Sequence, residues 1–272
     1  MNGRAIRAIV RKDLKVVAQS KGVLLPLIIV PAVMLVALPA FAALAPAATD
    51  LPITPLAGMD SFLATMPAGL QAELAGYDEA QRFVVLALVY FLAPMYLIVP
   101  LMVASVIAAD SFAGEKERKT LEALLYTPTT DREIFVAKLL SAWLPAVAIA
   151  LGGFALYSLV ANVAAWHVMG GVFFPNAMWI ALAFWVSPAV AGLGLGVTVL
   201  ISARAQSFQE AYQMGGVVVL PIVMLVVGQA AGVMYFSLLL VLLLGAALWI
   251  VDAALLCLGG RVFRRSEIIA RA

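Results

Sequence analysis

The sequence is poor in the residues that build disulfides, metal sites and catalytic centres. Cys257 is the only cysteine and His167 the only histidine among 272 residues. A single cysteine excludes an intrachain disulfide. The histidine stands beside Trp166 without a second soft ligand, which favours an interfacial aromatic position over a metal site. Charge is scarce as well: 12% of the residues are Asp, Glu, Lys or Arg and 65% are apolar, a composition typical of an integral membrane protein.

A nucleotide-binding motif is also missing. The stretch Gly114-Glu-Lys-Glu-Arg-Lys-Thr120 ends in a Lys-Thr pair, but it lacks the second glycine of a P-loop and is one residue too short. Its charged side chains would also disturb a cradle of backbone amides around a phosphate. The sequence contains no HExxH or GxSxG motif and no pair of intramembrane aspartates. We therefore expect a protein that is not an enzyme and that binds no cofactor itself.

Long apolar runs take up most of the chain. Crossing roughly 30 Å of hydrocarbon requires about 20 mostly apolar residues. The prediction is an all-α integral membrane protein with one domain over residues 1–272, containing an N-terminal segment (1–21), an outer segment (45–82) and a loop between spans two and three (110–138). The six predicted spans are Val23–Leu44, Phe83–Ala109, Leu139–Ala164, Ala177–Ile201, Met214–Gly232 and Phe236–Leu258.

The basic residues are distributed asymmetrically between the two sides of the predicted bundle. All of the 17 Lys and Arg residues except Arg82 lie before span one, between spans two and three, after span four or after span six. The charged residues of the opposite loops are mainly acidic. By the positive-inside rule, both termini and the loop between spans two and three are predicted to be cytoplasmic.

The N-terminal segment is predicted to form an amphipathic helix in the membrane interface. Arg4, Arg7, Arg11 and Lys15 recur at helical spacing, and apolar residues occupy much of the remainder. A basic helix of this kind lies at the membrane surface with its cations near lipid phosphates. Two interpretations stay open: a plain positively charged anchor, and an interfacial helix that also contacts a cytoplasmic partner.

The loop between spans two and three contains the only densely charged block, Gly114 to Ile134. Glu115 precedes Arg118 and Lys119 by three and four residues, which supports a short helix by local ion pairing. Pro128 ends this helix, and Thr130 with Glu133 forms a capping box for the next one. One amphipathic, charged helix between two spans indicates a docking surface, and the alternative is an ordinary solvated hairpin.

Single residues inside or beside the spans give further predictions. Asp252 lies in span six, where a carboxylate costs about 2.5–3.5 kcal/mol and usually has a partner or faces a cavity. We favour a structural role for Asp252, with Arg204 or Arg261 as its partner or with its carboxylate reaching the cytoplasmic surface. Pro94 and Pro100 predict bends in span two. Asp78 and Gln81 predict a capping box at the start of span two, and Met59–Gly76 predicts a short outer helix. Close contacts between helices are predicted at five glycines: Gly192, Gly194, Gly196, Gly228 and Gly232.

Several of these residues also carry a family resemblance. They are Asp110 to Leu125, Pro128, Asp131 to Ile134 and Lys138, together with the basic stretch Arg11-Lys-Asp-Leu-Lys15 before span one. This pattern resembles the ABC type-2 permeases, the membrane subunits of ATP-driven exporters, including the Nat-type group. The six spans, cytoplasmic termini and outer segment extend the similarity over nearly the whole chain.

The resemblance implies a type V exporter-like fold in which Phe112–Tyr126 is a coupling helix that inserts into a separate ABC ATPase subunit. ATP and Mg would bind that subunit. A permease dimer is implied, formed with a second copy or with a sister permease, in the cell membrane of a prokaryote, with lipid bilayer around it and no nucleic acid. The implied ATPase contacts are Phe112 and Leu121 as apolar anchors and Glu115, Lys116, Glu117, Arg118, Lys119 and Glu122 as polar contacts. A central cavity at the dimer interface, to which spans two and five contribute, would be lined by Tyr90, Met95, Tyr96 and Met224.

The alternative function is a secondary transporter or channel driven by an ion gradient. Asp252 as an ion-coupling carboxylate is the only residue that supports this alternative. An ATPase that co-purifies with the chain favours the first function, whereas gradient-driven flux that Asp252→Asn abolishes favours the second.

Overall fold

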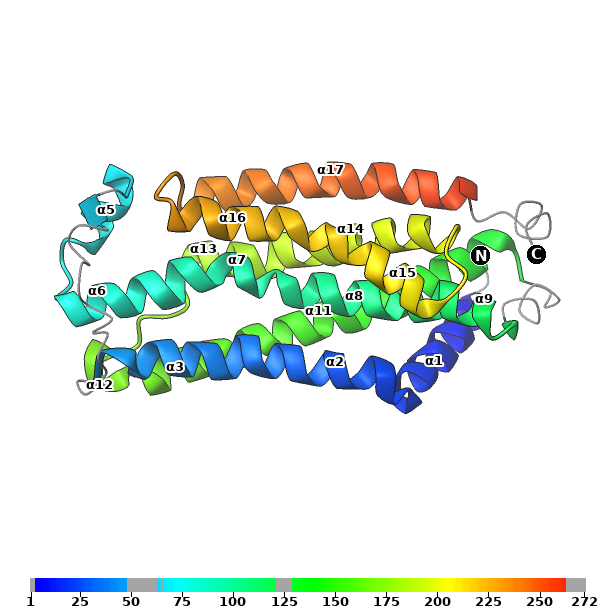
Figure 1. The fold of residues 1–272 in the computed structure, drawn as a ribbon, viewed down its shortest axis with the longest axis horizontal. Helices are drawn as coiled ribbons and strands as arrows, with labels where there is room; N and C mark the ends of the chain where they lie inside the picture. The colour runs from blue at the N-terminus through cyan, green and yellow to red at the C-terminus, as the bar shows by residue number, and fades with distance from the viewer. Residues whose placement is uncertain (1–2, 48–62, 65, 121–128, 263–272) are drawn as a thin grey trace.

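The protein is an elongated bundle of helices (Figure 1). The computed structural model describes residues 3–47, 63, 64, 66–120 and 129–262, and no strand occurs among these residues. The predicted all-α architecture with six spans is confirmed by six helical segments that are long and apolar enough to cross a membrane: Gly22–Leu44, Glu79–Glu117, Asp131–Ala164, Ala177–Ser202, Phe208–Ala230 and Leu238–Gly260.

Four of the spans are built from consecutive helical pieces with different hydrogen-bond registers. Span one consists of α2 (Lys21–Ala32), the π-helical η1 (Val33–Ala37) and α3 (Leu38–Leu44), and span two of α6 (Glu79–Val85), π-helical η3 (Leu86–Phe91), α7 (Leu92–Tyr96), α8 (Ile98–Ala109), π-helical η4 (Asp110–Gly114) and α9 (Glu115–Glu117). Span three is α11 (Asp131–Ala164), span four is α13 (Ala177–Ala181), π-helical η5 (Leu182–Val186) and α14 (Ser187–Ser202), span five is α15 (Phe208–Gly215), 3-10-helical η6 (Gly216–Val219) and α16 (Leu220–Ala230), and span six is α17 (Leu238–Val262).

Spans two and three extend beyond the thickness of a bilayer. With 34 residues, α11 is about 51 Å long at 1.5 Å per residue, compared with roughly 30 Å of hydrocarbon. The predicted capping box is confirmed at its start: the Thr130 side chain accepts from the Glu133 amide, and the Glu133 side chain accepts from the Thr130 amide. The charged start of α11 lies beside the charged end of span two. We call this end of the bundle the basic end.

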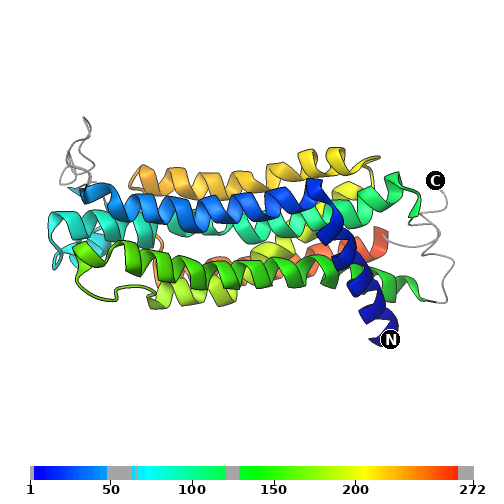
Figure 2. The same ribbon diagram turned by 90° about the horizontal axis from the view of Figure 1, so that it is seen from below.

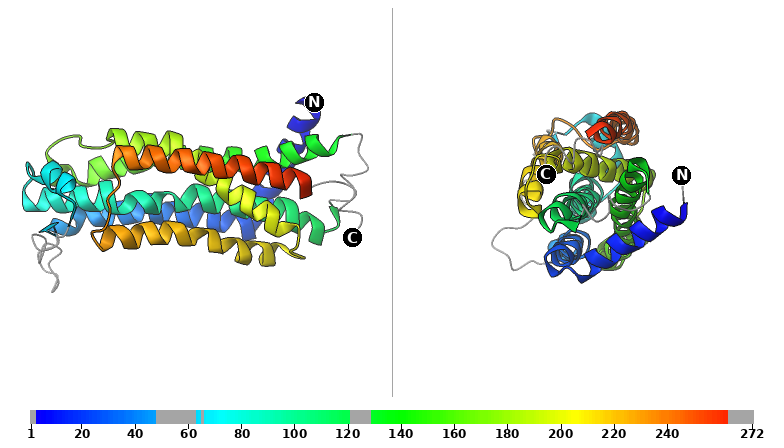
Figure 3. Two further views of the ribbon diagram at one scale, coloured as in Figure 1. Left: turned by 90° about the horizontal axis from the view of Figure 1, so that it is seen from above. Right: turned by 90° about the vertical axis from the view of Figure 1, so that its right-hand side faces the viewer.

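The N-terminal helix α1 (Gly3–Gln19) lies at the basic end, outside the bundle of spans. Ser20 separates α1 from α2, and α1 crosses the direction of the spans instead of following it (Figures 2 and 3). Ile9 and Val17 are buried on one face of α1. Ile9 packs against Ile134 at the start of α11, so the predicted amphipathic helix is attached to span three as well as to span one.

Span two is the most buried span and is not a regular α-helix. Its register changes from α to π over Leu86–Phe91, and a turn interrupts it at Leu97, between Pro94 and Pro100. Proline has no amide donor, so Pro94 leaves the carbonyl of Tyr90 without its helical partner. A side chain from span five replaces that donor, because Gln229 Nε2 lies 3.1 Å from Tyr90 O. Side chains from spans three and four also donate hydrogen bonds to two carbonyls of the π segment. Tyr157 Oη lies 2.6 Å from Leu88 O, and Trp179 Nε1 lies 2.8 Å from Val89 O.

The glycines of span four lie at close contacts with two other spans. A Cβ at Gly194 would lie 2.7 Å from the carbonyl oxygen of Leu101 in span two. A Cβ at Gly196 would lie 2.9 Å from Leu255 in span six, and one at Gly192 would collide with Asp252. These three glycines therefore confirm the predicted close contacts, with span two on one side of span four and span six on the other.

The opposite end of the bundle contains short outer helices. Within the predicted helix Met59–Gly76, the structure contains α5 (Ala68–Leu74), and residues 59–62 and 65 lie outside the described residues. Asp78 and Gln81 form the predicted capping box at the start of span two. The predicted turn between spans five and six is also present, and Gly232 adopts a φ of 71° there, so Gly232 serves the turn and not a helix contact.

Candidate functional site

The charged block begins as the end of span two and not as a separate helix. The sequence predicted one coupling helix over Phe112–Tyr126. In the structure, η4 and α9 continue span two as far as Glu117, and the helix is interrupted at Lys119, which has a φ of 55°. The start of the predicted helix was therefore wrong, since the apolar and charged parts of this segment form one continuous element. Residues 121–128, including Leu121 and Glu122, lie outside the described residues.

Glu115 is buried at the end of span two and is bound by two lysines from other helices. Its side chain pairs with Lys138 of α11, whose Nζ lies 2.7 Å from Oε2, and also with Lys12 of α1. Lys138 has no exposed surface. The predicted local pairs of Glu115 with Arg118 and Lys119 were wrong: Arg118 instead contacts Asp110 at 2.9 Å.

Asp13 of α1 joins the same group. Its Oδ2 accepts hydrogen bonds from the hydroxyls of Ser111 and Ser141, each at 3.1 Å, and its Oδ1 lies 3.2 Å from Lys12 Nζ. Lys138 Nζ also donates to the Ser111 carbonyl at 2.5 Å. We call Lys12, Asp13, Ser111, Glu115, Lys138 and Ser141 the buried ion cluster. It connects α1, the end of span two and the start of span three.

Phe112 is part of the packing around the buried ion cluster. It is only 6% exposed, and its ring lies 6.5 Å from that of Phe135, edge to face. Lys138 Nζ lies 5.4 Å above the Phe112 ring, within range of a cation–π interaction. The burial of Phe112 and Glu115 disagrees with the expectation that these two side chains contact a partner directly.

The end of span two also contacts the connection between spans four and five. Lys116 Nζ donates to the carbonyl of Ala205 at 3.3 Å. The Glu117 carboxylate accepts from the amide of Phe208 at 3.0 Å, at the first residue of α15. Glu117, Arg118, Lys119 and Thr120 are exposed. The end of span two is therefore a hub that touches α1, α11 and the start of span five and still presents charged residues outward.

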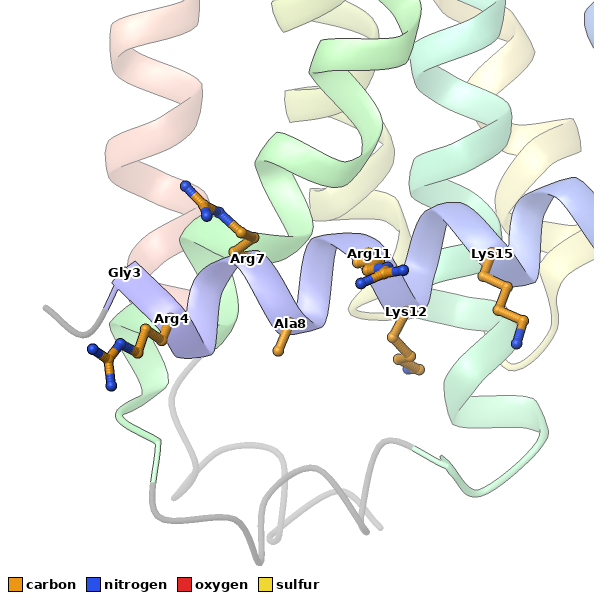
Figure 4. Close-up of a pocket in the computed structure, with 7 residues that line it drawn as sticks. All are labelled: Gly3, Arg4, Arg7, Ala8, Arg11, Lys12 and Lys15. Atoms are coloured by element: carbon orange, nitrogen blue, oxygen red, sulfur yellow. The ribbon is translucent and has the colours of Figure 1, made fainter.

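The predicted basic residues of α1 are exposed and line one open hollow of about 1120 Å³ (Figure 4). Lys12 lies at the border between this hollow and the buried ion cluster. Partial burial acts to lower the pKa of Lys12, but the hydrogen bond and charge of Glu115, together with Asp13, raise it above its ordinary value. Lys12 is therefore held in its charged form. The residues of α1 that line the hollow are Gly3, Arg4, Arg7, Ala8, Arg11, Lys12 and Lys15.

The four residues predicted to line a cavity do not share one surface. Tyr96 is fully buried, and its hydroxyl donates to the carbonyl of Ala150 at 3.1 Å. Tyr90 is also buried, whereas Met95 is half-buried and Met224 is 74% exposed. Both tyrosines belong to the packed core of the single chain, although α16 does pack against α7. Spans five and two are thus neighbours, as expected for a shared lining.

Asp252 is buried where span six crosses span four. Its exposure is 3%, and neither carboxylate oxygen has a hydrogen-bond partner within the described part of the chain. The predicted ion pair with Arg204 is not formed there, and the Arg261 side chain lies outside the description. The space for the carboxylate comes from Gly192 on the facing helix.

Sequence reasoning missed Asp13 and Lys138 as cluster members. Asp13 had a recognisable signal, since Ile9, Asp13 and Val17 recur every four residues on the buried face of an otherwise basic helix. Lys138 belonged to the family pattern, but its partner lies 23 residues away along the chain and cannot be identified from helical spacing.

The chain is similar to a known protein family. The family described as ABC-2 family transporter protein matches residues 7–250, from α1 into span six. The chain belongs to the ABC-2 transporter family. It is therefore a multi-pass membrane protein and the permease component of an ABC transporter, a component that generally lacks a nucleotide site of its own. A comparison with curated proteins gave no match.

Proposed function

We propose that this ABC-2 permease subunit exports its substrate by alternating access, driven by a separate ATPase subunit that docks at the end of span two. One observation carries the proposal: the end of span two is a single hub in contact with α1, span three and the start of span five. By the positive-inside rule the basic end faces the cytoplasm, where an ATPase binds ATP and Mg. The membrane is the cell membrane of a prokaryote.

The contacts of the hub explain how a movement of the ATPase would be transmitted to several spans. The ATPase is expected to press on the exposed residues after Glu115. Because Glu115 is held by Lys138 and Lys12, a displacement of span two carries α11 and α1 with it. The bond between Glu117 and the Phe208 amide carries the start of span five in the same step. The spans around a cavity would then move together.

The predicted ATPase contacts divide into two groups. Lys116, Glu117, Arg118 and Lys119 are at or near the surface, and we assign the direct polar contacts to them and to Glu122, with Leu121 as an apolar anchor. Phe112 and Glu115 are buried, so their role in coupling is to hold the hub together.

A second permease, either another copy or a sister subunit, is part of the proposal. Spans one, five and six expose large apolar side chains along their length, including Ile28, Met224 and Leu243. Met95 and Met224 are the predicted lining residues that stay accessible for a cavity between two permeases.

Affinity purification of the tagged chain from its native membrane, followed by mass spectrometry, tests the proposal. We expect a stoichiometric P-loop ATPase, which is lost in the double variant Lys119→Glu with Leu121→Arg. The control is Arg132→Glu, which reverses the charge of an exposed arginine at the same end that is not one of the hub residues. The absence of an ATPase from an intact preparation, or equal loss in both variants, would overturn the assignment.

The ion-driven alternative keeps one observation in its favour, the buried carboxylate of Asp252 without a partner in the described part of the chain. It predicts substrate flux into vesicles that contain this chain alone, driven by an ion gradient and abolished by Asp252→Asn. ATP-dependent flux that survives Asp252→Asn would exclude it.

A further inference from the structure

The basic face of α1 contains more positive charge than the described chain neutralises. Five cations fall on one side of the helix, and among them Lys12 is bound to Glu115 and Asp13. Within the described residues, Arg7, Arg11 and Lys15 form no ion pair. Mutual repulsion among these cations favours a bound anion.

The opposite face of α1 fixes its depth in the membrane. Ile9 and Asp13 are buried against the start of α11 and the end of span two. After Ser20, the chain enters span one directly at Gly22. Since α1 crosses the direction of the spans at the point where they begin, it lies at the level of the lipid headgroups (Figure 3).

The side chains on this basic face point in different directions. Figure 4 shows the guanidinium of Arg7 pointing along the spans, whereas Arg4, Lys12 and Lys15 point away from them. Leu14 is three residues after Arg11, and it is an exposed apolar side chain at 37%. A helix edge with exposed guanidinium groups next to an exposed leucine offers contacts for both a phosphate and an acyl chain.

We propose that this edge of α1 is a binding site for an anionic phospholipid, with Arg7 and Arg11 on the headgroup phosphate, Lys15 adding positive charge beside it, and Leu14 against the acyl chains. Arginine fits this ligand because its planar group binds phosphate oxygens through two parallel hydrogen bonds. An acidic soluble protein would satisfy the charges but not the exposed leucine at membrane depth. The site is separate from the ATPase hub and does not depend on that assignment.

Native mass spectrometry of the purified chain in neutral detergent tests this proposal, with phosphatidylglycerol and phosphatidylcholine as the two added lipids. We expect preferential binding of phosphatidylglycerol. The double variant Arg7→Gln with Arg11→Gln should weaken this binding about tenfold or more, since each cation near an anionic lipid surface strengthens the attraction to that surface. The control Arg132→Gln with Arg204→Gln removes the same charge from exposed positions at the same end and should change binding by less than about twofold, since those residues lie off α1.

A further variant distinguishes a lipid from a soluble anion. Leu14→Gln leaves the charge unchanged and should still weaken phosphatidylglycerol binding. The lipid proposal is overturned by any of three results: equal binding of the two lipids, equal loss in the test and control pairs, or inorganic phosphate competing as well as phosphatidylglycerol does. Elution profile and helix content confirm that each variant is folded, and all substituted residues are exposed.

Discussion

Glu115 and Asp252 are both buried carboxylates, but their surroundings differ. Glu115 lies between two lysines from separate helices, inside a group that also contains Asp13. Asp252 faces the backbone of Gly192 and has no hydrogen-bond partner among the described residues. The first acid sits where charged segments of three helices meet, and the second sits where apolar helices cross. The two carboxylates are therefore buried for different reasons. At the basic end, ion pairs between helices hold Glu115, whereas the absence of a side chain at Gly192 leaves room for Asp252.

The largest effect is expected from Lys138→Met. Lys138 is fully buried, and its loss leaves Glu115 with only the half-exposed Lys12. Removing one partner of a buried ion pair costs about 3–5 kcal/mol. The midpoint of thermal unfolding in detergent should fall well below that of Lys119→Met, an exposed control. Equal midpoints for the two variants would show that the buried ion cluster does not stabilise the fold.

A smaller effect is expected at the glycines of span four, and it should differ between neighbours. Gly194→Ala places a methyl 2.7 Å from the Leu101 carbonyl, a backbone atom that cannot turn aside. Overpacking of this kind costs about 1–3 kcal/mol. Gly192→Ala meets the carboxyl group of Asp252, with Cγ 2.9 Å from the new methyl, so it displaces a side chain and not a backbone atom. Alanine also favours the helix by about 1 kcal/mol. We expect Gly194→Ala to lower the unfolding midpoint more, and the reverse order would contradict the described contact between spans two and four.

A still smaller effect is expected from Asp252→Asn. The substitution removes no hydrogen bond or ion pair within the described part of the chain, and it keeps the shape of the side chain. Large losses of stability come from cavities, broken buried pairs or newly buried charges, and Asp252→Asn introduces none of these, so we expect a change of about 1 kcal/mol or less in the free energy of unfolding. The same thermal measurement applies. A loss as large as that of Lys138→Met would show that Asp252 and Glu115 are not as different as their contacts indicate.

The smallest effect concerns pH and Lys12. The pKa of Lys12 is raised above its ordinary value of 10.5 by Glu115 and Asp13, against the opposing effect of partial burial. A raised pKa of a cation stabilises the fold fully below its unfolded pKa, and this contribution is lost as pH rises through the folded value. The difference in unfolding midpoint between the wild type and Lys12→Gln should therefore be constant from about pH 7 to 9 and shrink above about pH 10.5. A difference that grows with pH would have the wrong sign.

Features encoded over short distances could be predicted from the sequence. The capping boxes at Asp78 and Thr130 depend on residues three positions apart, and both are present. The spans follow from the length of apolar runs. The ends of the spans were less accurate because charged residues continue two of the helices: span two reaches Glu117 and span three begins at Asp131.

The pairing inside the candidate site could not be predicted, because it is nonlocal. Local spacing predicted that Glu115 pairs with two cations in its own helix. In the structure Glu115 pairs instead with Lys12 of α1 and the fully buried Lys138 of α11, because a charge out of water gains more from a desolvated partner. Phe112 looked like an exposed anchor because its neighbours are charged, and its contact with Phe135 comes from another helix. Tyr96 belongs to the core for a similar reason, since the carbonyl of Ala150 in span three accepts a hydrogen bond from its hydroxyl.

The buried ion cluster also sets an order for biogenesis. Its members come from widely separated parts of the chain: Lys12 and Glu115 are 103 positions apart, and Asp13 and Ser141 are 128 apart. During synthesis the N-terminal helix emerges from the ribosome long before Lys138 and Ser141 are added, because Asp13 precedes Ser141 by 128 positions. Asp13 therefore stays hydrated at the membrane surface until span three inserts. Docking of the N-terminal helix is then a late event. It requires that the first three spans have already been inserted in the correct orientation.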